Sequence, residues 1–292
     1  AQDTLANTEN HFELTKEEPL TILHLVSRPH DTPLEPASSQ SLQSIVNSLG
    51  FDGVLRTEVC VAANWVQLKE RLSNSENPVH IVHFDGPVEL DCGSPYLLLE
   101  GTGQASDKLS VTRLAESMKQ NSISVLSLDS RGYFDAADRV AVDAEVGLAA
   151  VSHVAQHQGV KNILGTHYVG LPEITVRCFS AVFSHIATGL TLGQAIVEAR
   201  KRLQGQTESR DFTTEGKPFQ CWPLPILYGT GELIFFSSPQ QYSDLSQLDD
   251  FNDLRQRLFG FKDDLLPPKV RIASDRQFVE ALRATQESTP VY

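Results

Sequence analysis

Residues 80–87 read HIVHFDGP, an apolar run with two histidines that ends in aspartate, glycine and proline. Short apolar runs stopped by Gly and Pro are typical of a strand buried on both faces of a sheet. Because side chains alternate along a strand, His83 and Asp85 are expected on one face and Phe84 on the other. The stretch therefore predicts a buried strand that brings polar groups to its carboxyl end.

Strand-like runs alternate with helical patterns over most of the chain. A run rich in turn residues, PVELDCGSPYLLLEGTG at 87–103, interrupts the alternation and reads as an inserted β-hairpin. The alternation predicts an α/β fold with a mostly parallel sheet and helices on both faces. The expected strands are 21–29, 55–62, 79–86, 124–130, 162–169 and 222–229, and the expected helices are 38–50, 64–74, 110–122, 139–159, 175–189 and 191–204.

Composition suggests three parts and limits the partners. Residues 1–18 are polar and read as a flexible N-terminal arm, 19–236 form the α/β domain, and 237–292 read as a helical extension and linker to a further region. A net charge of −13 argues against nucleic acid and against an anionic membrane, since both favour basic surfaces. No dinucleotide fingerprint or phosphate loop is present, so no cofactor is expected.

The chain has four cysteines, which are far apart and lack metal-ligand spacing: Cys60, Cys92, Cys178 and Cys221. Neither a zinc site nor a disulfide framework is indicated, and a reducing cytoplasm fits best. The chain begins with Ala1 rather than Met, and we expect it to be a processed product or a piece of a longer protein.

Chemistry in a parallel sheet gathers where its strands end. The candidates at these ends are His83, Asp85, Gly86, Ser127, Asp129, Ser130, Arg131 and His167. A histidine in a buried strand is more often a hydrogen-bonded core residue than a catalyst, and a strand-end aspartate is often a turn residue. The functional alternative is a divalent-cation site at Asp85 and Asp129, since Mg²⁺ favours carboxylates and water.

Taken in order, several stretches resemble the CHAT family of caspase-like peptidase domains. The resemblance covers about residues 20–236 and is carried by TILHLVSRPHDTPLE, VHIVHFDG, YLLLEGTG, VLSLDSRG, GVKNILGTHYVGLPEITVRCFSAVFSHIATGLTLGQAIVEARKRL and WPLPILYG. It implies a caspase-type sheet and a catalytic His/Cys dyad, in which a thiolate attacks a peptide carbonyl.

Both dyad positions are substituted in this chain. Pro87 stands where the family has its catalytic histidine, and Asp129 stands where it has its cysteine. Loss of nucleophile and base together removes a factor of about a thousand or more in rate. The resemblance therefore implies a pseudo-peptidase that binds a protein or peptide partner, with other domains of the same chain among the candidate partners. The groove candidates are His83, Asp85, Gly86, Ser127, Ser130, Arg131 and His167.

An active peptidase remains the alternative. It requires His83 or His167 to meet one of the four cysteines, although none of the cysteines stands at the family's nucleophile position.

Overall fold

A computed structural model describes residues 14, 18–29, 54–61, 64–101, 106–137, 140–166, 172–207, 213–214, 217–218 and 225–236. Several expectations fall outside this part of the chain. They are the helix at 38–50, the extension at 237–292, nearly all of the arm at 1–18, and His167; of Arg131 the structure describes only the backbone.

The core of the fold is one twisted sheet whose central path has the order β11-β8-β6-β3-β1-β2. The strands β1, β2, β3, β6 and β8 run parallel, whereas β11 is antiparallel to β8. The six strands are β1 (Leu20–Val26), β2 (Leu55–Val61), β3 (Ile81–Asp91), β6 (Val125–Asp135), β8 (Asn162–Thr166) and β11 (Pro225–Tyr228). The mostly parallel sheet predicted from the alternation is confirmed.

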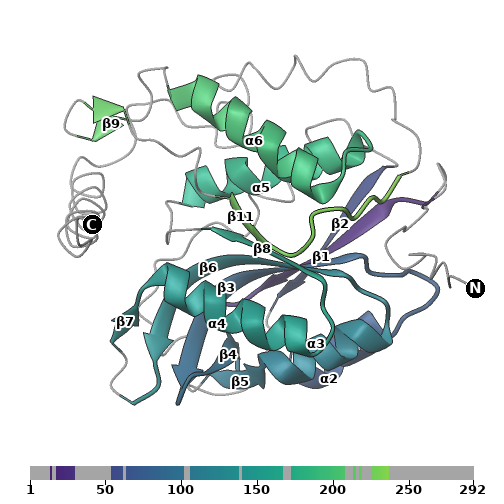
Figure 1. Ribbon diagram of the computed structural model, residues 1–292. Helices are drawn as coiled ribbons and strands as arrows, with labels where there is room; N and C mark the ends of the chain where they lie inside the picture. The colour runs from purple at the N-terminus through teal and green to yellow at the C-terminus, as the bar shows by residue number, and fades with distance from the viewer. Residues whose placement is uncertain are drawn as a thin grey trace, which may run out of the picture. The chain divides into compact units, whose positions relative to one another are not determined.

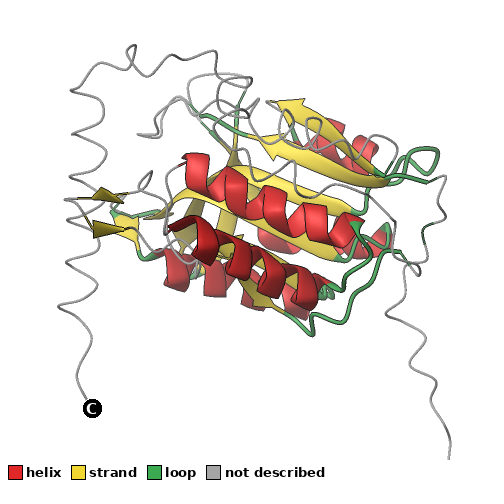
Figure 2. Ribbon diagram, turned by 90° about the horizontal axis from the view of Figure 1, so that it is seen from above, coloured by secondary structure: helices red, strands yellow, loops and turns green. Residues whose placement is uncertain are grey.

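Helices cover both faces of this sheet (Figure 1). Helices α2 (Trp65–Leu72), α3 (Val111–Gln120) and α4 (Ala144–His157) lie on one face, and α5 (Pro172–Ala187) and α6 (Leu192–Thr207) lie on the other. Seen from above, α5 and α6 run side by side, roughly along the direction of the strands (Figure 2). The predicted cap of α2 is present, because the side chain of Asn64 accepts a hydrogen bond from the Gln67 N–H.

Alternation along the two central strands separates an apolar face from a polar one. Val82, Phe84, Leu126 and Leu128 belong to the main hydrophobic cluster, which they share with residues of α2, α3 and α4. The intervening residues of β3 and β6 face α5, and they include the polar side chains described below. The sheet therefore has one apolar layer and one layer in which polar groups are buried.

Both central strands extend beyond the expected strand ends. After a register shift between Gly86 and Val88, β3 continues into a hairpin with β4 (Ser94–Leu99), as predicted for the insertion. The turn is Cys92–Gly93, where both residues have positive φ, rather than the Gly-Ser-Pro run that the sequence suggested. Strand β5 (Asp107–Ser110) adds to β4, and β7 (Ala141–Val142) adds to β6.

The helix predicted at 139–159 begins later in the structure, at Ala144. Ala141 and Val142 pair with β6 as β7, and the Asp143 side chain caps α4 by accepting the Glu145 N–H. Gly147 in this helix packs directly on a buried ring, because a Cβ there would lie 2.0 Å from Tyr133 Cδ1.

The chain divides into two units, residues 1–203 with 221–242 and residues 204–220 with 243–292. In the second unit the structure describes the end of α6 and a short ladder of β9 (Thr213–Thr214) with β10 (Lys217–Pro218). Among the described residues, none of the helices is both long and apolar enough to span a bilayer.

Candidate functional site

Two rows of polar side chains lie between the sheet and α5. The first row contains His24, His83 and Ser127, which are Cα partners on β1, β3 and β6. His83 Nδ1 lies 2.8 Å from Ser127 Oγ, and the two imidazole centroids are 5.0 Å apart. Edges of Phe179 and Phe183 from α5 cover the His83 ring. In this row His83 and Ser127 form a buried hydrogen-bonded pair packed under aromatic rings, whereas neither ring nitrogen of His24 has a hydrogen-bond partner among the described residues.

The second row contains Asp85 and Asp129, which are Cα partners two residues further along β3 and β6. The Asp85 carboxylate is bound by Arg28, whose Nη2 donates to Oδ2 at 2.7 Å while its Nη1 donates to the carbonyl oxygens of Ser27 and Asp85. The Nε2 atom of His24 lies 3.8 Å from the same Oδ2. Arg28 thus supplies Asp85 with a counter-charge and with a second hydrogen bond, to its carbonyl oxygen.

Asp129 takes its partner from the helix above the sheet. Thr175, near the start of α5, donates its hydroxyl to Asp129 Oδ2 at 3.0 Å. A carboxylate at a helix amino end is also favoured by the helix dipole. The Asp129 charge reaches Tyr133: burial is the main cause that raises the pKa of this phenol, a hydrogen bond with Ser130 lowers it, and Asp129 raises it further.

Pro87 lies within the bulge of β3. The ladder with β6 pairs Gly86 with Ser130 and then Val88 with Tyr133, so Pro87 falls where the register shifts. Proline has no N–H to donate to a ladder, and a bulge is one of the few places where a sheet tolerates it. A bulge also bends its strand, and β3 continues from this point into the hairpin. Pro87 therefore lies at a structural bend of β3.

Those groove candidates whose side chains the structure describes are buried rather than gathered on an exposed surface. His83, Asp85 and Ser127 share the face under α5 but are only 1, 3 and 0 % exposed. Ser130 is buried on the other side of β6, where its hydroxyl donates to the Gly132 carbonyl. Gly86 is buried too, since a Cβ there would lie 2.6 Å from Phe84 Cζ. In this conformation a partner can reach only the margin of these groups.

That margin is formed at the ends of β1 and β4. The backbone N–H of Arg28 donates to Glu100 Oε1 at 2.9 Å, and both residues are partly exposed. We call Arg28, Glu100 and Gly101 the strand-end rim. It is the part of the described surface that adjoins Asp85.

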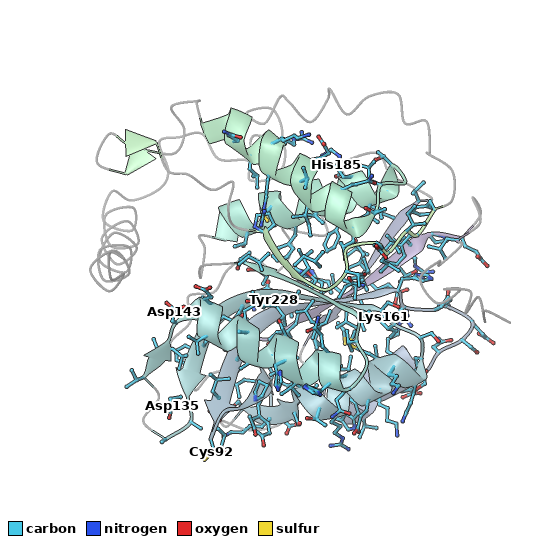
Figure 3. The ribbon with its side chains drawn as sticks, viewed as in Figure 1. Cys92, Asp135, Asp143, Lys161, His185 and Tyr228 are labelled. Carbon is cyan, nitrogen blue, oxygen red and sulfur yellow. The ribbon has the colours of Figure 1, made fainter. Side chains whose placement is uncertain are left out.

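The three described cysteines lie in different surroundings. Cys92 is exposed at the hairpin tip, away from α5 (Figure 3). Cys60 is half-buried on β2, where burial raises its pKa and Arg71 partly opposes that shift. Cys178 is fully buried on α5, one turn after Thr175 and adjacent to the Phe179 that covers His83. Cys221 lies outside the described residues.

A divalent cation at the strand ends has little support in this geometry. Asp85 already has a guanidinium at 2.7 Å, so a metal ion there would have to displace Arg28. Within the described ranges no cluster of three or more His, Cys, Asp or Glu side chains is placed to hold a metal.

Sequence reasoning missed three residues of this layer. Arg28 lies two residues after the end of β1, so the rule that functional side chains lie at strand ends could have selected it. Alternation along β1 places His24 beside His83 once β1 and β3 are paired. Thr175 carried no such signal, because its contact with Asp129 joins residues 46 positions apart through the packing of α5.

Comparisons with known proteins give structural matches but no sequence family. No protein-family model matches the chain, and no curated protein matches it. Among solved structures, the Drosophila initiator caspase Dronc aligns with a TM-score of 0.43 and 9% identity over 80% of this chain and 89% of its own. Caspase-1 from Spodoptera frugiperda aligns with a TM-score of 0.45 and 7% identity over 84% and 99%. Both alignments extend over most of each chain, at identities that say nothing of activity.

Proposed function

We propose that this chain is a catalytically degenerate caspase-like domain of the CHAT type that serves as a protein- or peptide-binding module. One observation carries the proposal. Asp129, which stands at the nucleophile position of the resemblance, is a buried carboxylate tied to Thr175. A carboxylate is a poor nucleophile toward an amide, and one that is 2 % exposed has no access to a peptide bond.

The second dyad position supports the same reading. Pro87 has no proton to transfer, and it occupies a bulge that gives β3 its bend into the hairpin. His83 is the nearest described imidazole in the strand, but its Nδ1 is engaged by Ser127 and its ring is covered by Phe179 and Phe183. This geometry is typical of a buried structural histidine rather than of a proton-transfer site.

We therefore assign the binding role to the strand-end rim, where the Arg28 N–H donates to the Glu100 carboxylate. Arg28 is held by Asp85 and leaves 18 % of its side chain exposed, while Glu100 presents a partly exposed carboxylate. A peptide that docks there would meet a rim fixed by three strands. Rigid elements lose little entropy on binding, which favours recognition without catalysis.

Selection of displayed peptides on the purified chain tests the proposal. We expect enriched peptides to be recovered intact and to bind less tightly to Glu100→Gln, which keeps an acceptor for the Arg28 N–H but removes the charge. Glu70→Gln, on an exposed turn of α2, is the matched control and should bind like wild type. Recovery of cleaved peptides, equal binding by Glu100→Gln, or no enrichment at all would contradict the proposal.

One observation favours a second candidate, a peptidase with a displaced pair. Cys178 lies on the buried side of α5 beside the ring that covers His83. If these two residues form the working pair after a rearrangement of α5, peptide turnover should vanish in Cys178→Ser and in His83→Gln but persist in Cys92→Ser. Absence of turnover in wild type removes this candidate.

A further inference from the structure

The outer side of α4 carries two histidines that the layer under α5 does not use. His153 and His157 are exposed and lie one helical turn apart, on the side away from the sheet. Their ring centroids are 4.4 Å apart with an interplanar angle of 72°. Within the described part of the chain, neither imidazole takes part in a hydrogen bond or ion pair.

We propose that His153 and His157 form a two-imidazole chelate for one divalent transition-metal ion, such as Zn²⁺, Cu²⁺ or Ni²⁺. Imidazole nitrogen binds such ions at about 2.0 to 2.1 Å for zinc. Two histidines at i and i+4 on a helix can direct one nitrogen each toward the same ion. The site has no third protein donor among the described residues, so water completes the coordination.

Helix α4 holds the two histidines at a fixed spacing. Its inner side is buried through Leu148, Val151 and Ala155, and Asp143 caps its first turn. The backbone spacing of the histidines therefore exists before the metal binds, and only two exposed side chains need to be ordered. A pre-formed spacing of this kind raises affinity because less conformational entropy is lost.

The surroundings also set which ions bind. Glu145 is the nearest carboxylate before the pair along α4, two helical turns from His153, and Ala149 and Gln156 occupy the turns beside the histidines. Mg²⁺ and Ca²⁺ favour several oxygen ligands, and among the described residues no cluster of three or more His, Cys, Asp or Glu side chains is placed to hold a metal. Cu²⁺ should bind more tightly than Ni²⁺ or Zn²⁺.

Calorimetric titration of the full chain with NiCl₂ and ZnCl₂ tests the proposal. A Cys92→Ser background removes the exposed thiol as a competing ligand. Because the chain has nine histidines, the comparison of variants rather than binding alone identifies the site. We expect His153→Gln and His157→Gln each to lose at least about tenfold in affinity, since either change leaves a single imidazole.

Gln156→Ala, an exposed change on the same turn, should bind like its parent. Thermal unfolding gives a second readout: the metal should raise the midpoint of the parent, and each histidine variant should lose most of that rise. The proposal is overturned if the parent binds neither ion, or if either histidine variant retains the parent's affinity. Because both substitutions are exposed and use a good helix former, loss of folding is not expected.

Discussion

Removal of Arg28 should destabilise the fold much more than removal of an exposed arginine. The Asp85 side chain is 5 % exposed and receives Arg28 Nη2 at 2.7 Å, and the same guanidinium also donates to two carbonyl oxygens. Loss of one partner of a buried ion pair costs about 3 to 5 kcal/mol. Because the Arg28 side chain is 18 % exposed, water screens part of the interaction, and we expect Arg28→Met to cost about 2 to 3 kcal/mol.

The assay is equilibrium unfolding in urea, followed by circular dichroism. Arg56→Met is the matched control, because Arg56 pairs with Glu58 on β2 with 48 % of its side chain exposed and should cost less than about 1 kcal/mol. In an Asp85→Asn background, Arg28→Met should cost clearly less than in wild type, since the charge that it leaves behind is gone. Equal losses for Arg28→Met and Arg56→Met would refute the view that Arg28 compensates a buried charge.

Three further predictions follow from the packing and from the titration of particular groups. Gly147→Ala should destabilise by about 1 to 3 kcal/mol in urea unfolding despite the better helix propensity of alanine, because the new Cβ meets the Tyr133 ring; an unchanged midpoint would contradict this. His80 is buried and accepts the Thr21 N–H, and burial lowers its pKa from 6.5 to about 4, so its contribution to stability should be full above pH 6.5 and lost as the pH falls toward 4. Unfolding at pH 4.5 and 7 should show a smaller difference for His80→Gln than for wild type, and equal differences would refute the assignment. Under native conditions iodoacetamide should label Cys92 quickly, Cys60 slowly and Cys178 hardly at all, as peptide mapping by mass spectrometry can check; rapid labelling of Cys178 would show that α5 opens.

The sequence predicted the order of strands and helices well, because each buried strand of this sheet is a short apolar run bounded by turn residues. It placed β3 and the hairpin correctly and set His83 and Asp85 on one face, which their register confirms. It did not predict that β3 and β6 continue past their polar residues, because a bulge at Pro87 reads in sequence as a strand end. It also placed the start of α4 too early, since Ala141 and Val142 fit either a helix or a short edge strand.

The sequence predicted which strand residues share a face but not what surrounds them. Alternation could show that His83, Asp85, Ser127 and Asp129 share a face, because that depends on local geometry alone. It could not show that α5 buries them, since Phe179 and Thr175 reach them through tertiary packing. Exposure depends on how the layers assemble, and for this reason the sequence did not show that His83, Asp85 and Ser127 are buried.

Hydrolysis of a peptide library by the purified chain tests the central claim most directly. The chain assayed carries only the Cys92→Ser substitution. Its reaction products are detected by mass spectrometry, and a peptide-directed electrophilic probe reports any cysteine nucleophile. We predict no cleavage, and no probe attached to Cys60, Cys178 or Cys221, because Pro87 and Asp129 offer neither base nor thiolate. Turnover that is abolished by Cys178→Ser or His83→Gln would contradict the account and identify an active peptidase.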